Sequence, residues 1–146
     1  MEPPNRALFL DLLAAYFAGP LQIVAGQSLY TGRHPAKVDA AVVLTSSGGT
    51  SNLALCGLRW THVQLLTRAT DYVWASNRAW TAHELAHQMA RQIEATGPII
   101  LGTPPGQVTI LNCHPVSEPS DLGFDVADGH IFTVNFRFQL GVTARQ

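Results

Sequence analysis

The chain has 146 residues, enough for one buried core and too few for two ordinary domains, so we expect a single domain over residues 1–146. Hydrophobic residues make up 47% of it and charged residues only 13%, against roughly 25% charged in an average soluble domain. This composition favours a surface that is partly covered by neighbouring subunits. The formal net charge of −1 excludes a strong basic field, so neither specific DNA binding nor attraction to an anionic membrane is indicated.

The first predicted element is a helix that Asn5 can cap and that Gly19-Pro20 ends. The apolar stripe of this helix consists of Phe9, Leu12, Leu13 and Tyr16. Its apolar run is interrupted by Asp11, is too short to span a bilayer, and lacks the flanks of a signal peptide. We therefore expect a soluble protein made in the cytosol, without a membrane segment.

Two strands are predicted next. Apolar residues alternate from Val38 to Leu44, and Thr61 to Arg68 alternates again with Val63 and Leu65 on one face. The intervening run Ser46-Ser47-Gly48-Gly49-Thr50-Ser51 lacks the Gly-Lys-Ser/Thr ending of a phosphate-binding loop. A flexible connection is the favoured interpretation.

A long helix is predicted from Asp71 to Thr96, where Gly97-Pro98 stops it. Its apolar residues recur at spacings of three and four, and most are small: Ala75, Ala79, Ala82, Ala86, Met89 and Ile93. Small residues permit close packing on a sheet. We expect Trp60, Trp74 and Trp80 to serve as core or interface anchors, because their spacing builds no ligand platform.

The C-terminal part predicts further strands, at Val108 to Cys113 and Ile131 to Leu140, the second with an aromatic core face. Between them lies an acidic, turn-rich stretch that suits an exposed loop or hairpin. Cys56 and Cys113 match no metal or redox spacing, so two buried reduced thiols are expected. The predicted class is α/β (α+β), a mainly antiparallel sheet packed against an N-terminal helix and one long central helix.

One motif argues for an enzyme. The sequence His83-Glu84-Leu85-Ala86-His87 matches the H-E-x-x-H pattern of zinc metallopeptidases, in which two histidines bind zinc and the glutamate is the general base. The stretch from Trp80 to His87 resembles the active-site helix of small metallopeptidases found beside phage repressors. This alternative hypothesis assigns His83 and His87 as ligands and Glu84 as base.

A catalytic zinc also needs a third protein ligand, and the sequence does not supply one in a recognisable place. Ala90 and Ile93 stand where the metzincin pattern has glycine and histidine. The remaining candidates follow no pattern that would fix them beside the two histidines: His114, Glu118, Asp121, Asp125 and His130. We therefore favour a structural role for the motif, and expect no catalytic residues, no metal and no cofactor.

The order of features along the chain resembles a known family. It begins with the segment from Leu29 to Pro35 and the strand leading into Gly48-Gly49, and continues with Val63 to Tyr72, which opens the long helix. The segments from Pro119 to Asp125, from Asp128 to His130 and from Val134 to Phe136 complete the pattern. This order is similar to that of the phage minor capsid and tail terminator family, over nearly the whole chain.

The resemblance implies a structural virion protein rather than an enzyme. Such a protein would cap the tail tube, stop its polymerisation and form the joining surface to the head at the virion neck. Its expected partners are further copies of itself in a six-membered ring, the tail tube protein, and a head completion or connector protein. DNA would pass through the ring without specific binding.

The acidic stretch supplies the candidate site residues of this hypothesis. We expect Glu118, Asp121, Asp125 and Asp128 to face the ring lumen, where negative potential would keep passing DNA from sticking. Two other hypotheses stay open, the zinc peptidase and a generic binding domain. The ring predicts self-association without metal, the peptidase predicts stoichiometric zinc, and the binding domain predicts a monomer with neither property.

Overall fold

The computed structural model describes residues 6–22, 29–32, 40–51, 59–103, 106–125 and 128–141. These segments form two helices and seven strands in one mixed sheet. The elements are α1 (Arg6–Ala18), β1 (Leu29–Thr31), β2 (Ala41–Ser51), β3 (Arg59–Ala69), α2 (Tyr72–Thr96), β4 (Ile99–Thr103), β5 (Gly106–Pro115), β6 (Ser120–Phe124) and β7 (His130–Leu140). The predicted α+β class is confirmed.

The sheet has the strand order β1-β2-β3-β7-β5-β4, and β6 pairs with β7 as well. Only the β1–β2 pair is parallel, and the other described pairs are antiparallel. β5 pairs with the C-terminal half of β7 and β6 with its N-terminal half, so the two lie end to end along one edge of β7. Residues 116–119 lie between them, and the Val116 amide still donates to the Asn135 carbonyl of β7 at 2.9 Å.

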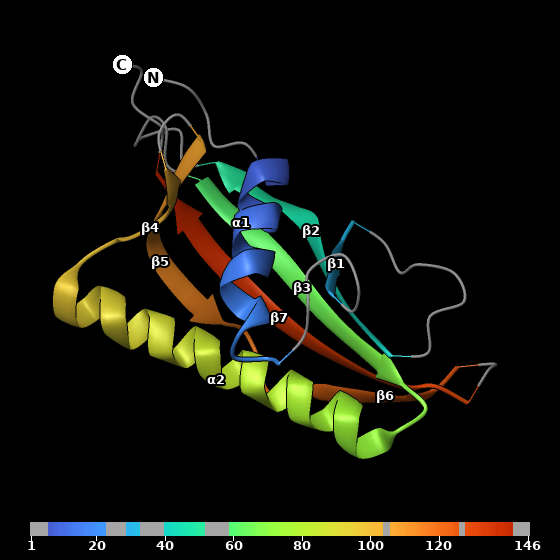
Figure 1. The fold of residues 1–146 in the computed structure, drawn as a ribbon. Coiled ribbons are helices and arrows are strands. Elements are labelled where there is room, and N and C mark those ends of the chain that lie inside the picture. The colour runs from blue at the N-terminus through green and yellow to red at the C-terminus, as the bar shows by residue number, and fades with distance from the viewer. Residues whose placement is uncertain are drawn as a thin grey trace.

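Both helices cover the same face of the sheet (Figure 1). Phe9 and Phe17 of α1 pack edge-on against Phe138 and Phe136 of β7, with ring centroids 5.2 and 6.1 Å apart. α2 runs across β3, β5 and β7, and the Thr67 hydroxyl donates to its Ala75 carbonyl. The result is a two-layer fold in which apolar side chains of alternate strand positions meet the helices.

The long helix follows its sequence closely. The Asp71 side chain accepts a hydrogen bond from the Val73 amide at 3.0 Å and so caps the helix. Gly97 has a φ of 93°, a conformation that favours glycine, and its amide donates to the Ile93 carbonyl at 2.8 Å. The predicted alanine stripe is buried, together with Leu85 and Met89. The predicted bounds of this helix are confirmed.

One prediction about the first half of the chain is wrong, and some of the residues named in that half lie outside the described segments. The serine and glycine run after Leu44 is not a flexible connection, because Ser46–Ser51 continues β2 and pairs with β3 across a register shift between Ser46 and Gly49. β3 provides hydrogen-bond partners for the backbone of this run. The small residues of the run do not by themselves indicate a strand. Asn5, Val38 and Cys56 lie outside the described residues.

Cys113 is a buried free thiol on β5. Its Sγ lies 3.7 Å from the Ala86 carbonyl oxygen of α2. Burial raises the pKa of this thiol to about 12, because the thiolate would lose its hydration. The prediction of a buried reduced thiol is confirmed at this position.

Candidate assembly surface

Exposed apolar side chains gather where the first turn of α2 meets the hairpin of β6 and β7. Phe124 is 68% exposed, Val73 60% and Tyr72 46%. The Tyr72 ring lies 5.1 Å from the His130 ring, and the Phe124 ring lies 4.5 Å from the same imidazole. We call Tyr72, Val73, Phe124 and His130 the apolar patch.

The sheet register explains why this patch exists. Phe124 is opposite His130 in the β6–β7 ladder, so the two side chains point to one face, and that face also carries Phe132 two residues on. Phe132 is buried, and Tyr72 packs against it at a centroid distance of 5.3 Å. Because α2 begins at Tyr72, the core face of the sheet continues beyond the N-terminal end of the helix that covers it. The patch is therefore an uncovered extension of the core.

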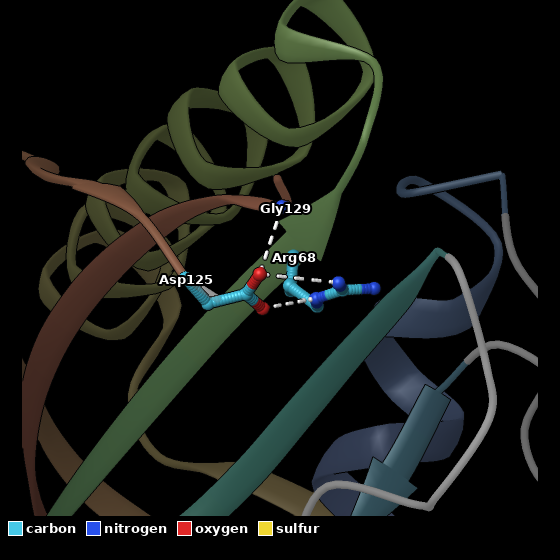
Figure 2. A network of polar contacts seen from close by, with 3 residues as sticks. All are labelled: Arg68, Asp125 and Gly129. Carbon is cyan, nitrogen blue, oxygen red and sulfur yellow. Dashed lines mark hydrogen bonds and ion pairs between the residues drawn. The ribbon is translucent and has the colours of Figure 1, made fainter. Parts of the chain in front are cut away.

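An ion pair holds the turn of this hairpin in place (Figure 2). The Arg68 guanidinium of β3 donates from Nε to Asp125 Oδ2 at 2.6 Å and from Nη2 to Asp125 Oδ1 at 3.3 Å. Asp125 Oδ1 also accepts the Gly129 amide at 2.8 Å, and the Asp125 amide donates to the Gly129 carbonyl at 2.9 Å. The carboxylate thus ties both arms of the hairpin to the central strand β3.

Gly129 is required by this arrangement. A Cβ at this position would lie 2.3 Å from the Arg68 Nε, far inside any real contact distance. The guanidinium therefore reaches Asp125 only because residue 129 has no side chain. Asp128 next to it adopts a left-handed φ of 59°, which aspartate tolerates better than most residues.

Replacing Asp125 with alanine should destabilise the protein, because it leaves the Arg68 guanidinium and the Gly129 amide without this acceptor. The Asp125 side chain is 26% exposed and the Arg68 side chain 11%. Because both groups are largely buried, we expect the free energy of unfolding to fall by about 1–3 kcal/mol. Urea unfolding measures this loss. Glu118→Ala, at an exposed position in the same acidic stretch, is the control and should change stability by less than about 0.5 kcal/mol. Equal effects of both substitutions would contradict the role of the ion pair.

The four acidic residues singled out in the sequence do not share one environment. Glu118, Asp121 and Asp128 are exposed, whereas Asp125 is half-buried in the ion pair with Arg68. Asp121 also accepts a hydrogen bond from the Gly123 amide at 2.8 Å. All four lie on or just before the β6–β7 hairpin.

The histidines of the H-E-x-x-H motif lie together on one flank of α2. Their Nε2 atoms are 3.2 Å apart and their rings are nearly perpendicular, at 84°. Glu84 instead points into solvent, where its carboxylate accepts from the Arg91 guanidinium at 3.0 Å. The predicted helical context of the motif is confirmed.

Among the described residues, the surroundings of this pair supply no third zinc ligand. Within the described segments there is no cluster of three or more His, Cys, Asp or Glu side chains placed to hold a metal ion. The pKa of His83 is lowered, first by burial and then by His87, while the carboxylates of Glu118 and Glu84 act in the opposite direction. Of the third-ligand candidates, Glu118 is thus close enough to affect His83, and His130 belongs to the apolar patch.

A pocket of about 450 Å³ lies between the turn after α1 and the middle of α2, and its charged lining residues are Arg78 and Glu84. The two motif histidines do not line it. No described helix is long and apolar enough to cross a membrane. The apolar patch and its hairpin are the candidate functional surface, because they expose several large apolar side chains in one place.

The fold and this surface define a small α+β protein that exposes apolar side chains beside an acidic hairpin. A family model described as "Bacteriophage tail terminator protein" matches residues 19–142. The chain therefore belongs to the bacteriophage tail terminator family, as its resemblance predicted, and it is a phage structural protein of the tail or neck.

Other comparisons agree with the fold. A chain of the structure titled "Virion of native gene transfer agent (GTA) particle" superposes with a TM-score of 0.53 and 12% sequence identity, covering 92% of this chain and 91% of that chain. At this identity the likeness concerns the fold alone. No curated protein matches the sequence.

The apolar patch was not predicted from the sequence. Its aromatic residues are scattered over the start of α2, β6 and β7, and only the hairpin register brings them together. One signal was present, since Leu122 and Phe124 are apolar residues within a stretch otherwise typical of an exposed turn.

Proposed function

We propose that this chain is a single tail-terminator-like domain over residues 1–146 that assembles into a six-membered ring on the end of the tail tube. The ring stops polymerisation of the tube and offers its opposite face to a head completion or connector protein. A ring of this kind is built from heterologous contacts that close by rotation. Its place is the virion neck, and its role is geometric rather than catalytic.

The observation that carries this proposal is the apolar patch. Apolar side chains of the core face stay exposed to water beyond the N-terminal end of α2. Burying one Phe side chain in a contact would contribute about 1.5–3 kcal/mol to the free energy of association. Apolar and aromatic side chains of this kind are typical anchors of subunit contacts. We assign the patch to the contact between neighbouring subunits, which also fits the low content of charged residues.

The acidic residues on and before the β6–β7 hairpin would line the inside of the ring. A contact through the hairpin brings one acidic stretch from each subunit to the same radius of the ring. We propose that Glu118, Asp121, Asp125 and Asp128 face the lumen, with the charge of Asp125 largely balanced by Arg68. The resulting negative potential repels the phosphate backbone and lets DNA pass without specific binding.

Removing this charge tests the lumen assignment. The variant Glu118→Lys, Asp121→Lys, Asp128→Asn keeps a residue that tolerates the left-handed backbone at 128. Particles carrying it should assemble but deliver DNA at least about tenfold less often, because DNA would adhere to a basic lumen. The control is Glu94→Lys, at an exposed position near the end of α2. Unchanged DNA delivery by the triple variant would place these residues elsewhere.

Tube assembly in vitro tests the capping function. Purified tail tube protein of the same phage is allowed to polymerise with and without this chain, and tube lengths are measured by electron microscopy. The chain should shorten the tubes in proportion to its molar ratio, because a capped end adds no further rings. Tube lengths that do not respond to the chain would contradict a terminator function.

A further inference from the structure

The H-E-x-x-H segment is a sequence motif to which the proposed ring function gives no role. Its two imidazoles are held on adjacent turns of a well-packed helix, with buried Ala82 and Ala86 beside them on the core side. Their Nε2 atoms lie 3.2 Å apart. Two nitrogens bound to one tetrahedral zinc ion at 2.0–2.1 Å are separated by about 3.3–3.4 Å.

We propose that His83 and His87 form a two-histidine site for a divalent transition-metal ion, with no catalytic function. The rings need little movement to receive the ion, because the helix fixes their Cβ positions and the nitrogens already have the required separation. Imidazole nitrogen prefers zinc, copper and nickel over calcium or magnesium. The remaining coordination positions are open to water.

The buried Nδ1 of His83 limits the affinity for the ion that we expect of this site. The Nδ1 of His83 is buried and has no hydrogen-bond partner in the structure. Metal-binding histidines usually donate their second nitrogen to a carboxylate or carbonyl, and losing such a partner lowers metal affinity by about 10–100-fold. The site should therefore bind its ion more weakly than a structural zinc site with a complete outer shell.

The competing explanation is a hydrogen bond between the two rings, in which one Nε2–H donates to the other Nε2. The distance alone fits both arrangements. The two differ when a metal is offered, because an ion displaces the shared proton and gains both nitrogens as ligands. Metal binding is therefore the deciding observation, and it is independent of whether the chain caps a tail tube.

Zinc titration of the full-length, untagged chain by isothermal calorimetry tests the proposal. We expect one zinc ion per chain and a rise in the melting temperature with zinc concentration, because the ion binds the folded helix. His83→Ala and His87→Ala should each weaken binding at least tenfold, because each removes one of the two ligands. His62→Ala, at an exposed position on β3, is the matched control and should bind as the native chain does.

Circular dichroism separates a lost site from a lost fold. His87 is only partly buried and alanine favours the helix, so His87→Ala should retain the native helix content. A folded His87→Ala chain that binds zinc as tightly as the native chain would overturn the proposal. Absence of zinc binding by the native chain would overturn it as well and would leave the inter-ring hydrogen bond as the explanation.

Discussion

Phe124→Asp is expected to weaken self-association strongly while leaving the fold intact. Phe124 is the most exposed large apolar residue of the patch and lies on the short strand β6, so the substitution does not open a cavity. At an interface it would replace an apolar anchor with a charge that must be desolvated. A loss of at least about 2 kcal/mol at each contact corresponds to roughly 30-fold weaker association. Sedimentation over a range of concentrations measures the change.

The matched control for this variant is Ile100→Asp. Ile100 is also exposed, at 57%, but lies on β4 at the opposite edge of the sheet from β1 and away from β6. It should associate as the native chain does, because its strand has no part in the apolar patch. If Phe124→Asp assembles normally, or if both variants fail equally, the patch is not the subunit contact.

Phe136→Ala is expected to cause the largest loss of stability among the substitutions considered. Phe136 is fully buried in the middle of β7 and packs against Phe17 and Phe138. Truncating a buried phenylalanine costs about 3–5 kcal/mol, through lost burial and the cavity that remains. That is a large part of the 5–15 kcal/mol by which native domains are stable. Urea unfolding measures the change in the free energy of unfolding.

Phe124→Ala serves as the comparison, because it removes the same atoms from an exposed site. Its expected effect on the free energy of unfolding of the dissociated chain is within about 0.5 kcal/mol. Similar losses for Phe124→Ala and Phe136→Ala would show that Phe136 does not lie in the core.

The long elements could be predicted because local sequence and tertiary packing agree in them. In α2 the Asp71 cap, the alanine stripe and Gly97 all indicate the same helix, and the burial of β7 alternates from Val134 to Leu140. The β2 extension through Ser46–Ser51 could not be predicted, because only pairing with β3 makes a glycine- and serine-rich run a strand. Local composition there indicates a loop, and the neighbouring strand decides otherwise.

The candidate site was less accessible from the sequence than the fold. The acidic stretch was predicted as an exposed loop or hairpin. The half-buried environment of Asp125 could not be predicted, because its ion pair with Arg68 joins residues 57 positions apart. The apolar patch depends on a ladder register that no local pattern specifies. The two histidines, in contrast, were fixed by helical spacing alone, and their adjacency was predictable.

The most direct test of the terminator assignment is to image tail tubes assembled with this chain by electron microscopy. The assignment predicts a single ring of six copies at one end of each tube, absent when Phe124→Asp replaces the native chain. A native chain that is missing from the tube ends, or that is spread along the tube wall, would contradict it.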